Sequence, residues 1–101
     1  MEKEVEYLKE AIVNALHPVK IFLFGSFAKG NAKKHSDFDF YIVMNDGVDL
    51  NAMTTLAYKS VRNIKTRPVD IIVGTDEMFN RRVNFNSIER EVEKTGMVIY
   101  G

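Results

Sequence analysis

The sequence of 101 residues contains no cysteine and no long apolar run. Without cysteine, the protein can form neither disulfides nor a thiolate metal site. No apolar stretch approaches the roughly 20 residues that a membrane-spanning helix needs. The first four residues are mostly charged and lack the apolar core of a signal peptide, so we expect a cytoplasmic protein without membrane contact.

An excess of charge is also missing, because 14 lysines and arginines balance 14 aspartates and glutamates. With a net charge of zero, no overall electrostatic field attracts a nucleic acid or an anionic membrane. Nucleic acid is therefore a disfavoured partner. The weak repulsion between copies is compatible with a homo-oligomer.

Linkers, internal repeats and low-complexity tracts are absent, which predicts a single domain over residues 1–101. Apolar spacing and turn signals predict helices at 3–16, 27–29, 50–65, 76–83 and 86–95. Short apolar runs predict strands at 21–24, 38–44, 69–73 and 97–100. This order predicts an α/β (α+β) domain, with a small mixed central sheet flanked by helices.

Helix-end signals and apolar faces refine three of these helices. Pro18 ends the first helix, which buries Val5, Leu8, Ile12 and Leu16. The helix at 50–65 is expected to bury its apolar stripe: Leu50, Met53, Leu56, Ala57, Val61 and Ile64. Asn86 and Glu89 have the spacing of a capping box for the last helix, which Gly96 ends.

Gly25-Ser26 interrupts the first apolar strand and precedes a short helical segment. Such a turn exposes backbone N–H groups and the Ser26 hydroxyl at the positive end of a helix, where phosphate oxygens bind. The alternative is an ordinary strand-to-helix turn with Ser26 as the N-cap. The turn is not a P-loop, since no Gly-Lys-Ser/Thr follows at the required spacing.

Three aspartates occur in or beside apolar strands. Strand alternation places Asp37 and Asp39 on one face, where their charges raise each other's pKa unless a cation neutralises them. Alternatively, Asp37 belongs to a turn and accepts a local hydrogen bond, which leaves Asp39 unexplained. Asp70 stands inside a third apolar strand, where an isolated buried aspartate is rare. Its obvious partner is a cation shared with the other two, and carboxylates are hard ligands suited to two Mg²⁺ ions.

These residues resemble a family signature. Gly25-Ser26, ten intervening residues and Asp37-Phe38-Asp39 resemble the Gly-Ser-x10-Asp-x-Asp motif of the polymerase-beta-like nucleotidyltransferase superfamily. Residues 68–72 resemble the strand that carries the third carboxylate of that family. In size the chain is similar to the minimal nucleotidyltransferase (MNT) domains, and the resemblance extends through residues 96–100.

The resemblance implies a role for each motif residue. Asp37 and Asp39 would bind both Mg²⁺ ions, and Asp70 would bind the catalytic ion and orient or deprotonate the acceptor hydroxyl. Gly25 and Ser26 would contact the β- and γ-phosphates of a nucleoside triphosphate, ATP in the leading interpretation.

Four further residues near the motif carry or can carry positive charge. Lys29 stands where relatives often carry arginine for the same phosphates, but lysine lacks the bidentate fork. Lys33, Lys34 and His35 can add a local positive field, with a solvated loop as the alternative.

Larger members of the superfamily carry a further domain that binds the acceptor, and this sequence ends at Gly101. We therefore expect the acceptor to be held by a dimer partner, a second protein or the target itself. The MNT group resembles the antitoxin half of MNT–HEPN toxin–antitoxin pairs, in which AMP passes from ATP to a tyrosine of the helical HEPN toxin. The leading hypothesis is a protein adenylyltransferase that neutralises such a partner.

Two other functions remain open. The domain can be a binding module that neutralises its partner by contact alone. It can also be the catalytic subunit of a small-molecule nucleotidyltransferase of the aminoglycoside type, with the acceptor domain on another chain.

Overall fold

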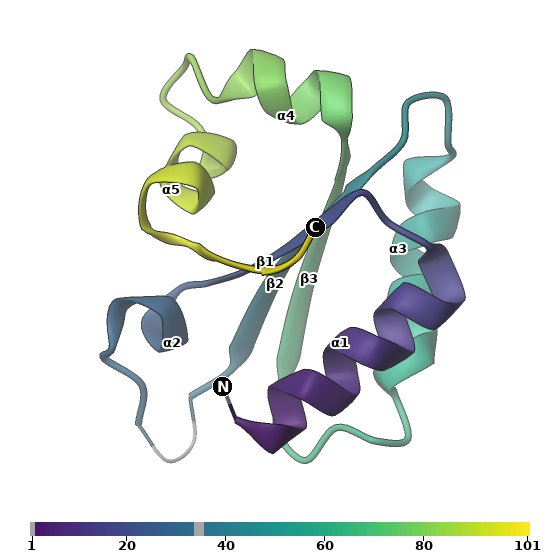
Figure 1. Cartoon of the computed structure of the whole chain (residues 1–101), viewed down its shortest axis with the longest axis vertical. Coiled ribbons are helices and arrows are strands. Elements are labelled where there is room, and N and C mark those ends of the chain that lie inside the picture. Colours follow the sequence, from purple (N-terminus) through teal and green to yellow (C-terminus); the bar gives the residue numbers. More distant parts are fainter. Residues whose placement is uncertain (1, 34–35) are drawn as a thin grey trace.

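The computed structural model describes residues 2–33 and 36–101, which fold into a four-stranded sheet with helices on both faces (Figure 1). The elements in chain order are α1 (Lys3–Leu16), β1 (Lys20–Phe24), α2 (Ser26–Lys29), β2 (Phe38–Met44), α3 (Leu50–Val61), β3 (Val69–Thr75), α4 (Asp76–Arg82), α5 (Ile88–Thr95) and β4 (Met97–Tyr100). The strand order is β3-β2-β1-β4. The β2–β3 pair is parallel, whereas β1 runs antiparallel to both β2 and β4, so the predicted mixed sheet is confirmed.

The main core lies between one face of the sheet and the pair of helices α1 and α3. The predicted apolar stripe of α1 is buried, and Leu8 and Ile12 are fully inaccessible. Alternate residues of β2 enter the same core, as the strand period requires: Phe38, Phe40, Ile42 and Met44. The predicted division of β2 into two faces is therefore confirmed.

The opposite face of the sheet is covered only in part. Here Phe22, Tyr41, Phe79 and Val92 form a second, smaller core under α4 and α5. Helices α4 and α5 cover the part of this face near the C-terminal ends of β2 and β3, because α4 begins directly after β3. At the start of the same strands, Asp39 is half-buried and Asp70 is exposed. The fold thus leaves its acidic strand positions accessible.

Helix α3 is shorter than the predicted 50–65 segment. It ends at Val61, and Ile64, which was expected to be buried, is 45% exposed. The N–H groups of Ile64 and Lys65 both donate to the Val61 carbonyl, which closes the helix in a tight turn. This turn allows the chain to return to the sheet at Val69. Strand β3 is longer than predicted, because it continues to Thr75 rather than ending at Val73.

The predicted capping box at Asn86 and Glu89 is wrong. Ser87 is the N-cap of α5, and its Oγ accepts the N–H of Arg90 at 3.2 Å. Glu89 instead turns inward, is 1% exposed and accepts a hydrogen bond from the Tyr41 hydroxyl. A residue expected at a helix start is therefore a buried link between α5 and the sheet.

None of the helices in residues 2–33 and 36–101 has the length and apolar character to span a membrane.

Candidate active site

The backbone of Gly25 lies directly against the carboxylate of Asp39. Antiparallel pairing of β1 with β2 places Phe24 opposite Asp39, so the turn that follows β1 meets that side chain. A Cβ added at Gly25 would collide with Oδ2 of Asp39. Gly25 also has φ +73° and ψ −149°, a conformation open essentially to glycine alone. The Gly25-Ser26 turn and Asp39 of β2 are therefore in direct contact.

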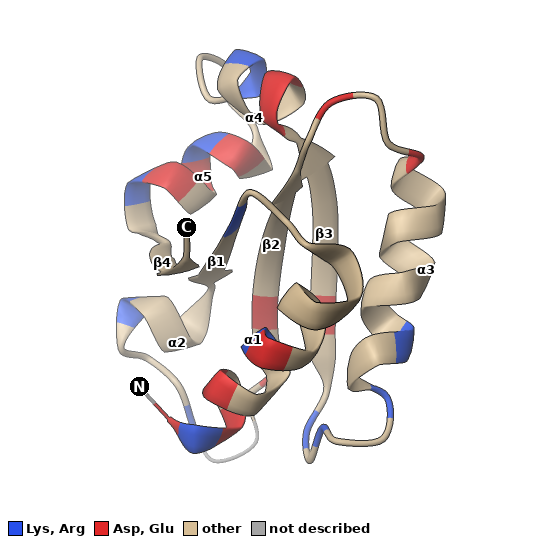
Figure 2. Ribbon diagram, turned by 45° about the vertical axis from the view of Figure 1, so that its right-hand side comes forward, with Lys and Arg blue, Asp and Glu red and all other residues tan. Residues whose placement is uncertain are grey.

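Asp39 and Asp70 are direct neighbours in the parallel β2–β3 pair. They are the acidic residues of these strands, and the two red bands lie side by side in Figure 2. Burial, and then the negative charges of Asp70 and Asp37, raise the pKa of Asp39. For Asp39, burial is therefore the largest cause of the raised pKa, and the neighbouring carboxylates add to it.

Asp70 differs from the sequence expectation, because its side chain is exposed rather than buried. The reason is its position: β3 is an edge strand, and this part of its face is not capped by the small core under α4 and α5. Asp70 therefore needs no buried cationic partner to be stable. Its exposure leaves it free to meet a ligand from solution.

The three aspartates have the donor atoms that a hard divalent cation prefers, but their side chains do not converge on one point. Within the two described segments, no three acidic or histidine side chains stand close enough together to hold one ion. Asp37 precedes β2 and is half-buried, whereas Asp70 is exposed to solvent. The charges of Asp70 and Asp37 also repel that of Asp39, and a hard divalent cation bound among them would relieve this repulsion.

Ser26 is the first residue of α2 and not its N-cap, so the alternative interpretation of Ser26 is wrong. The N-cap is Gly25, which has no side chain to supply a hydrogen bond. The short helix is closed by the Lys29 N–H donating to the Gly25 carbonyl at 3.1 Å and the Asn31 N–H donating to the Ser26 carbonyl at 2.9 Å. The Ser26 side chain is half-buried beside Gly25.

Lys29 forms an ion pair with Glu91 of α5, with 2.9 Å between Nζ and Oε1. The hydrogen bond and charge of Lys29 are the main reasons why the pKa of Glu91 is lowered. Both side chains are nearly half exposed, so solvent weakens this attraction and Lys29 can exchange partners. Lys33 is exposed, whereas Lys34 and His35 lie outside the described residues.

Sequence reasoning missed two of these relationships. Nothing in the local pattern around Glu91 indicated that it would meet Lys29, 62 positions earlier in the chain. The contact between Gly25 and Asp39 was also not foreseen. The sequence did contain a signal for this contact, because a glycine that interrupts an apolar strand often marks a place where another group approaches the backbone closely.

A family model described as polymerase beta, nucleotidyltransferase, matches residues 6–101. A relative from Methanocaldococcus jannaschii, named as a candidate protein adenylyltransferase (MJ0604), is 36% identical over 81 residues. That match covers 80% of this chain and 77% of the relative. The chain belongs to the polymerase beta nucleotidyltransferase family, and it is a nucleotidyltransferase.

Solved structures share the fold at low sequence identity. A toxin–antitoxin structure with AMP-PNP superposes with a TM-score of 0.68 at 21% identity, over 99% of this chain and 74% of that one. A mutant of the MntA-HpeT toxin–antitoxin gives 0.65 at 18% identity, with the same coverage. A candidate nucleotidyltransferase from Sulfolobus solfataricus gives 0.55 at 18% identity, over 94% of this chain and 80% of that one.

Proposed function

We propose that this protein is a Mg²⁺-dependent protein adenylyltransferase that transfers AMP from ATP to a tyrosine of a helical HEPN-type toxin and thereby acts as its antitoxin. The observation that carries the proposal is the position of Asp39 between two other elements of the motif. Its carboxylate lies against the Gly25 backbone, and its backbone is in register with Asp70 on the next strand. The Gly-Ser turn and the two strand aspartates thus meet at one end of the sheet, where a nucleotide could bind.

In this proposal, Asp37, Asp39 and Asp70 would hold two Mg²⁺ ions. When bound, such ions neutralise the triphosphate, lower the pKa of the attacking hydroxyl and stabilise the leaving pyrophosphate. The protein residues mainly orient the reactants, and in-line phosphoryl transfer demands little more from them. Asp70, which is exposed at the sheet edge, can accept the proton of the acceptor hydroxyl.

The triphosphate would lie across the turn between β1 and α2. Gly25 presents backbone without a side chain, and Ser26 supplies a hydroxyl donor beside it. Lys29, one helical turn away from Gly25, can leave Glu91 and bind a phosphate oxygen. The absence of a Cβ at Gly25 allows the phosphates to approach the backbone closely while Asp39 remains in contact with the turn.

Support for a protein acceptor comes from the relatives. The M. jannaschii relative is assigned to protein adenylylation, and solved neighbours of the same fold are toxin–antitoxin structures, one of which contains AMP-PNP. Tyrosine as the acceptor, a HEPN-type partner and Mg²⁺ dependence are parts of the proposal. A partner protein would bring its tyrosine to the exposed side of Asp70.

The test is incubation of the protein with a HEPN-type candidate partner, sought among the products of neighbouring genes, in the presence of Mg²⁺ and ATP labelled at the α-phosphate. Label on a tyrosine of the partner, lost in Asp39→Asn, would support the proposal. Label on an added aminoglycoside instead would identify a small-molecule enzyme. If no label is transferred and the Asp37→Asn/Asp39→Asn protein still neutralises its partner, the function is binding by contact.

A further inference from the structure

Arg67 lies just before β3, in a position that sequence reasoning did not single out. Its guanidinium carbon is 4.7 Å from the ring centre of Phe38 and 5.2 Å from that of Phe27. The two rings themselves pack at 4.5 Å between centres. Only 23% of the Arg67 side chain is exposed, so the cation is largely enclosed by aromatic and polar neighbours.

These contacts reach both chain neighbours of Asp37. Nη1 of Arg67 donates to the carbonyl of Ser36 at 3.4 Å, and the guanidinium covers the ring of Phe38. The Phe38 N–H donates to the carbonyl of Pro68, the residue after Arg67, at 3.1 Å. The peptide segment that carries Asp37 is therefore held on both sides by the segment that leads into Asp70.

Arg67 is itself held from the other side by the start of α1. Its Nε is 3.5 Å from Oε1 of Glu4. Oε2 of Glu4 accepts hydrogen bonds from the backbone N–H of Thr66 at 2.8 Å and from its hydroxyl at 2.6 Å. Burial would raise the pKa of Glu4, but the hydrogen bonds from Thr66 and the charge of Arg67 leave that pKa lowered. The carboxylate is thus ionised and available to orient the guanidinium.

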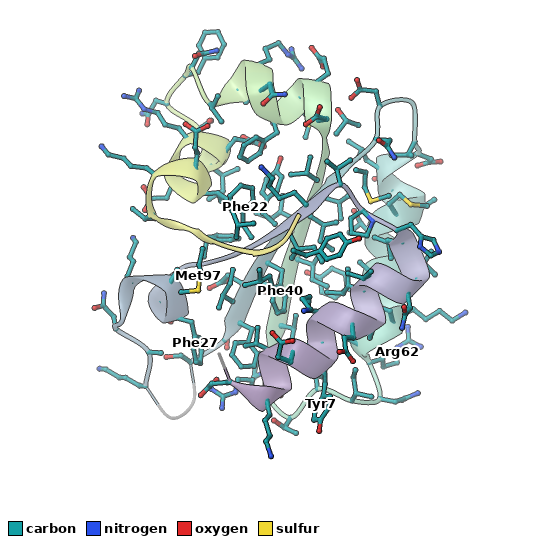
Figure 3. The ribbon with its side chains drawn as sticks, in the orientation of Figure 1. Tyr7, Phe22, Phe27, Phe40, Arg62 and Met97 are labelled. Carbon is teal, nitrogen blue, oxygen red and sulfur yellow. The ribbon has the colours of Figure 1, made fainter. Side chains whose placement is uncertain are left out.

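Figure 3 shows Phe27 on the side of α2 that faces the sheet, where it packs against the main core. Because Phe27 belongs to the helix that follows Gly25-Ser26, Arg67 contacts both halves of the motif. The Arg67 guanidinium stacks on Phe27 of α2. On the Asp37 segment it contacts the Phe38 ring and donates to the Ser36 carbonyl.

We propose that Arg67 is a positioning residue that sets the direction of Asp37 relative to Asp39 and Asp70, and so the metal affinity of the three aspartates. The inference rests on the proposed function, in which Asp37 is a metal ligand. A planar guanidinium can lie over two rings and still donate in its own plane to a carbonyl and a carboxylate. Lysine has the same charge but cannot make these contacts together.

The test compares Arg67→Lys with Arg62→Lys, a change at the exposed C-cap of α3. Mn²⁺ binding to the purified protein is measured by electron paramagnetic resonance, without ATP or partner. We expect Arg67→Lys to weaken Mn²⁺ binding by about tenfold, as loss of a group that orients a ligand does, and Arg62→Lys to leave it unchanged. Equal affinity in wild type and Arg67→Lys would overturn the proposal.

A double-mutant cycle with Asp37→Asn separates positioning from a general loss of structure. If Arg67 acts through Asp37, Arg67→Lys has no further effect on Mn²⁺ binding once Asp37 is asparagine. An undiminished tenfold loss in the Asp37→Asn protein would show that Arg67 acts elsewhere, and would refute the proposal.

A readout without metal keeps the inference separate from the proposed function. Hydrogen exchange of the Phe38 amide reports whether the Asp37 segment is held against Pro68. We expect Arg67→Lys to speed this exchange at least tenfold, while core amides of α1 keep wild-type rates. If wild type binds no Mn²⁺ either alone or with ATP but the exchange rises, the proposed function fails and the positioning of the Asp37 segment stands. Unchanged exchange would disprove the positioning role.

Discussion

The Tyr41 hydroxyl donates a 2.7 Å hydrogen bond to Oε2 of Glu89 in the small core under α4 and α5. Tyr41 is 0% exposed and Glu89 is 1% exposed. Among the described residues, Oε1 of Glu89 has no hydrogen-bond partner, and Arg82 approaches Oε2 only to 3.9 Å. The bond from Tyr41 is therefore the main hydrogen bond that the buried Glu89 carboxylate accepts.

Tyr41→Phe is expected to destabilise the protein by about 2 kcal/mol, because it leaves the buried Glu89 without its hydrogen-bond donor. The measurement is urea unfolding followed by circular dichroism. Tyr7→Phe is the matched control, since Tyr7 is 63% exposed and projects from the surface of α1 (Figure 3). An equal, small loss in both variants would show that the bond contributes nothing net.

Alkaline pH should destabilise the wild type more than Tyr41→Phe. Burial, and then the hydrogen bond and charge of Glu89, raise the pKa of Tyr41 above its ordinary value of 10. The unfolded chain therefore loses this proton first, and folding stability falls as the pH rises above about 10. Unfolding free energies between pH 8 and pH 11 check this. Parallel curves for the two proteins would contradict it.

Asp39→Asn is expected to stabilise the metal-free protein near neutral pH. Because the pKa of Asp39 is raised in the folded state, stability falls as the pH rises through that raised value, and the ionised carboxylate is unfavourable at pH 7. We expect the melting temperature to increase by about 3 °C. Mg²⁺ should raise the melting temperature of the wild type and have little effect on the variant. A destabilised metal-free variant would refute the explanation.

Gly25→Ala should abolish nucleotide transfer and lower stability by about 2 kcal/mol, because a Cβ would strike Asp39 in a conformation that alanine avoids. Gly30→Ala is the matched control. Gly30 also has a positive φ, +77°, but a Cβ there would meet no atom within 4 Å. Thermal unfolding and the labelling assay should show a partial loss of stability and near-normal activity for Gly30→Ala. Equal damage in both variants would argue against a specific role for the Gly25–Asp39 contact.

Glu91→Gln should strengthen ATP binding, since it releases Lys29 from its ion pair for the phosphates. We expect KM for ATP to fall roughly threefold with little change in melting temperature, because exposed ion pairs contribute little to stability. Glu93→Gln, on the exposed side of α5, is the control. A higher KM in Glu91→Gln would mean that Glu91 holds Lys29 in its productive position.

Several features of this protein could be predicted from local sequence patterns. The bounds and buried stripe of α1 were predicted correctly, because apolar residues at helical spacing and a proline near the end are sufficient. The two faces of β2 also follow from a period of two. The same period predicts Asp37 and Asp39 on one face; Asp37 precedes β2 in the structure, and its charge is one of the causes that raise the pKa of Asp39.

Other features depended on contacts between distant segments. The exposure of Asp70 was missed, since a strand's position at the edge of a sheet does not appear in its own residues. Ile64 was predicted to be buried because the helical period continues past the point where α3 must turn back. Glu89 matched a capping pattern, but Tyr41, 48 residues away, provides a buried donor.

The sequence by itself was sufficient to identify the family, because Gly25-Ser26 and Asp37-Phe38-Asp39 stand at the spacing of its signature, and the family model matches residues 6–101. The tertiary structure decided how these groups meet. The parallel register sets Asp70 beside Asp39, the antiparallel β1 brings Gly25 against the same carboxylate, and α5 supplies a partner for Lys29. Periodicity depends on neighbouring residues alone, whereas strand register, edge position and ion pairing depend on the packing of the whole chain.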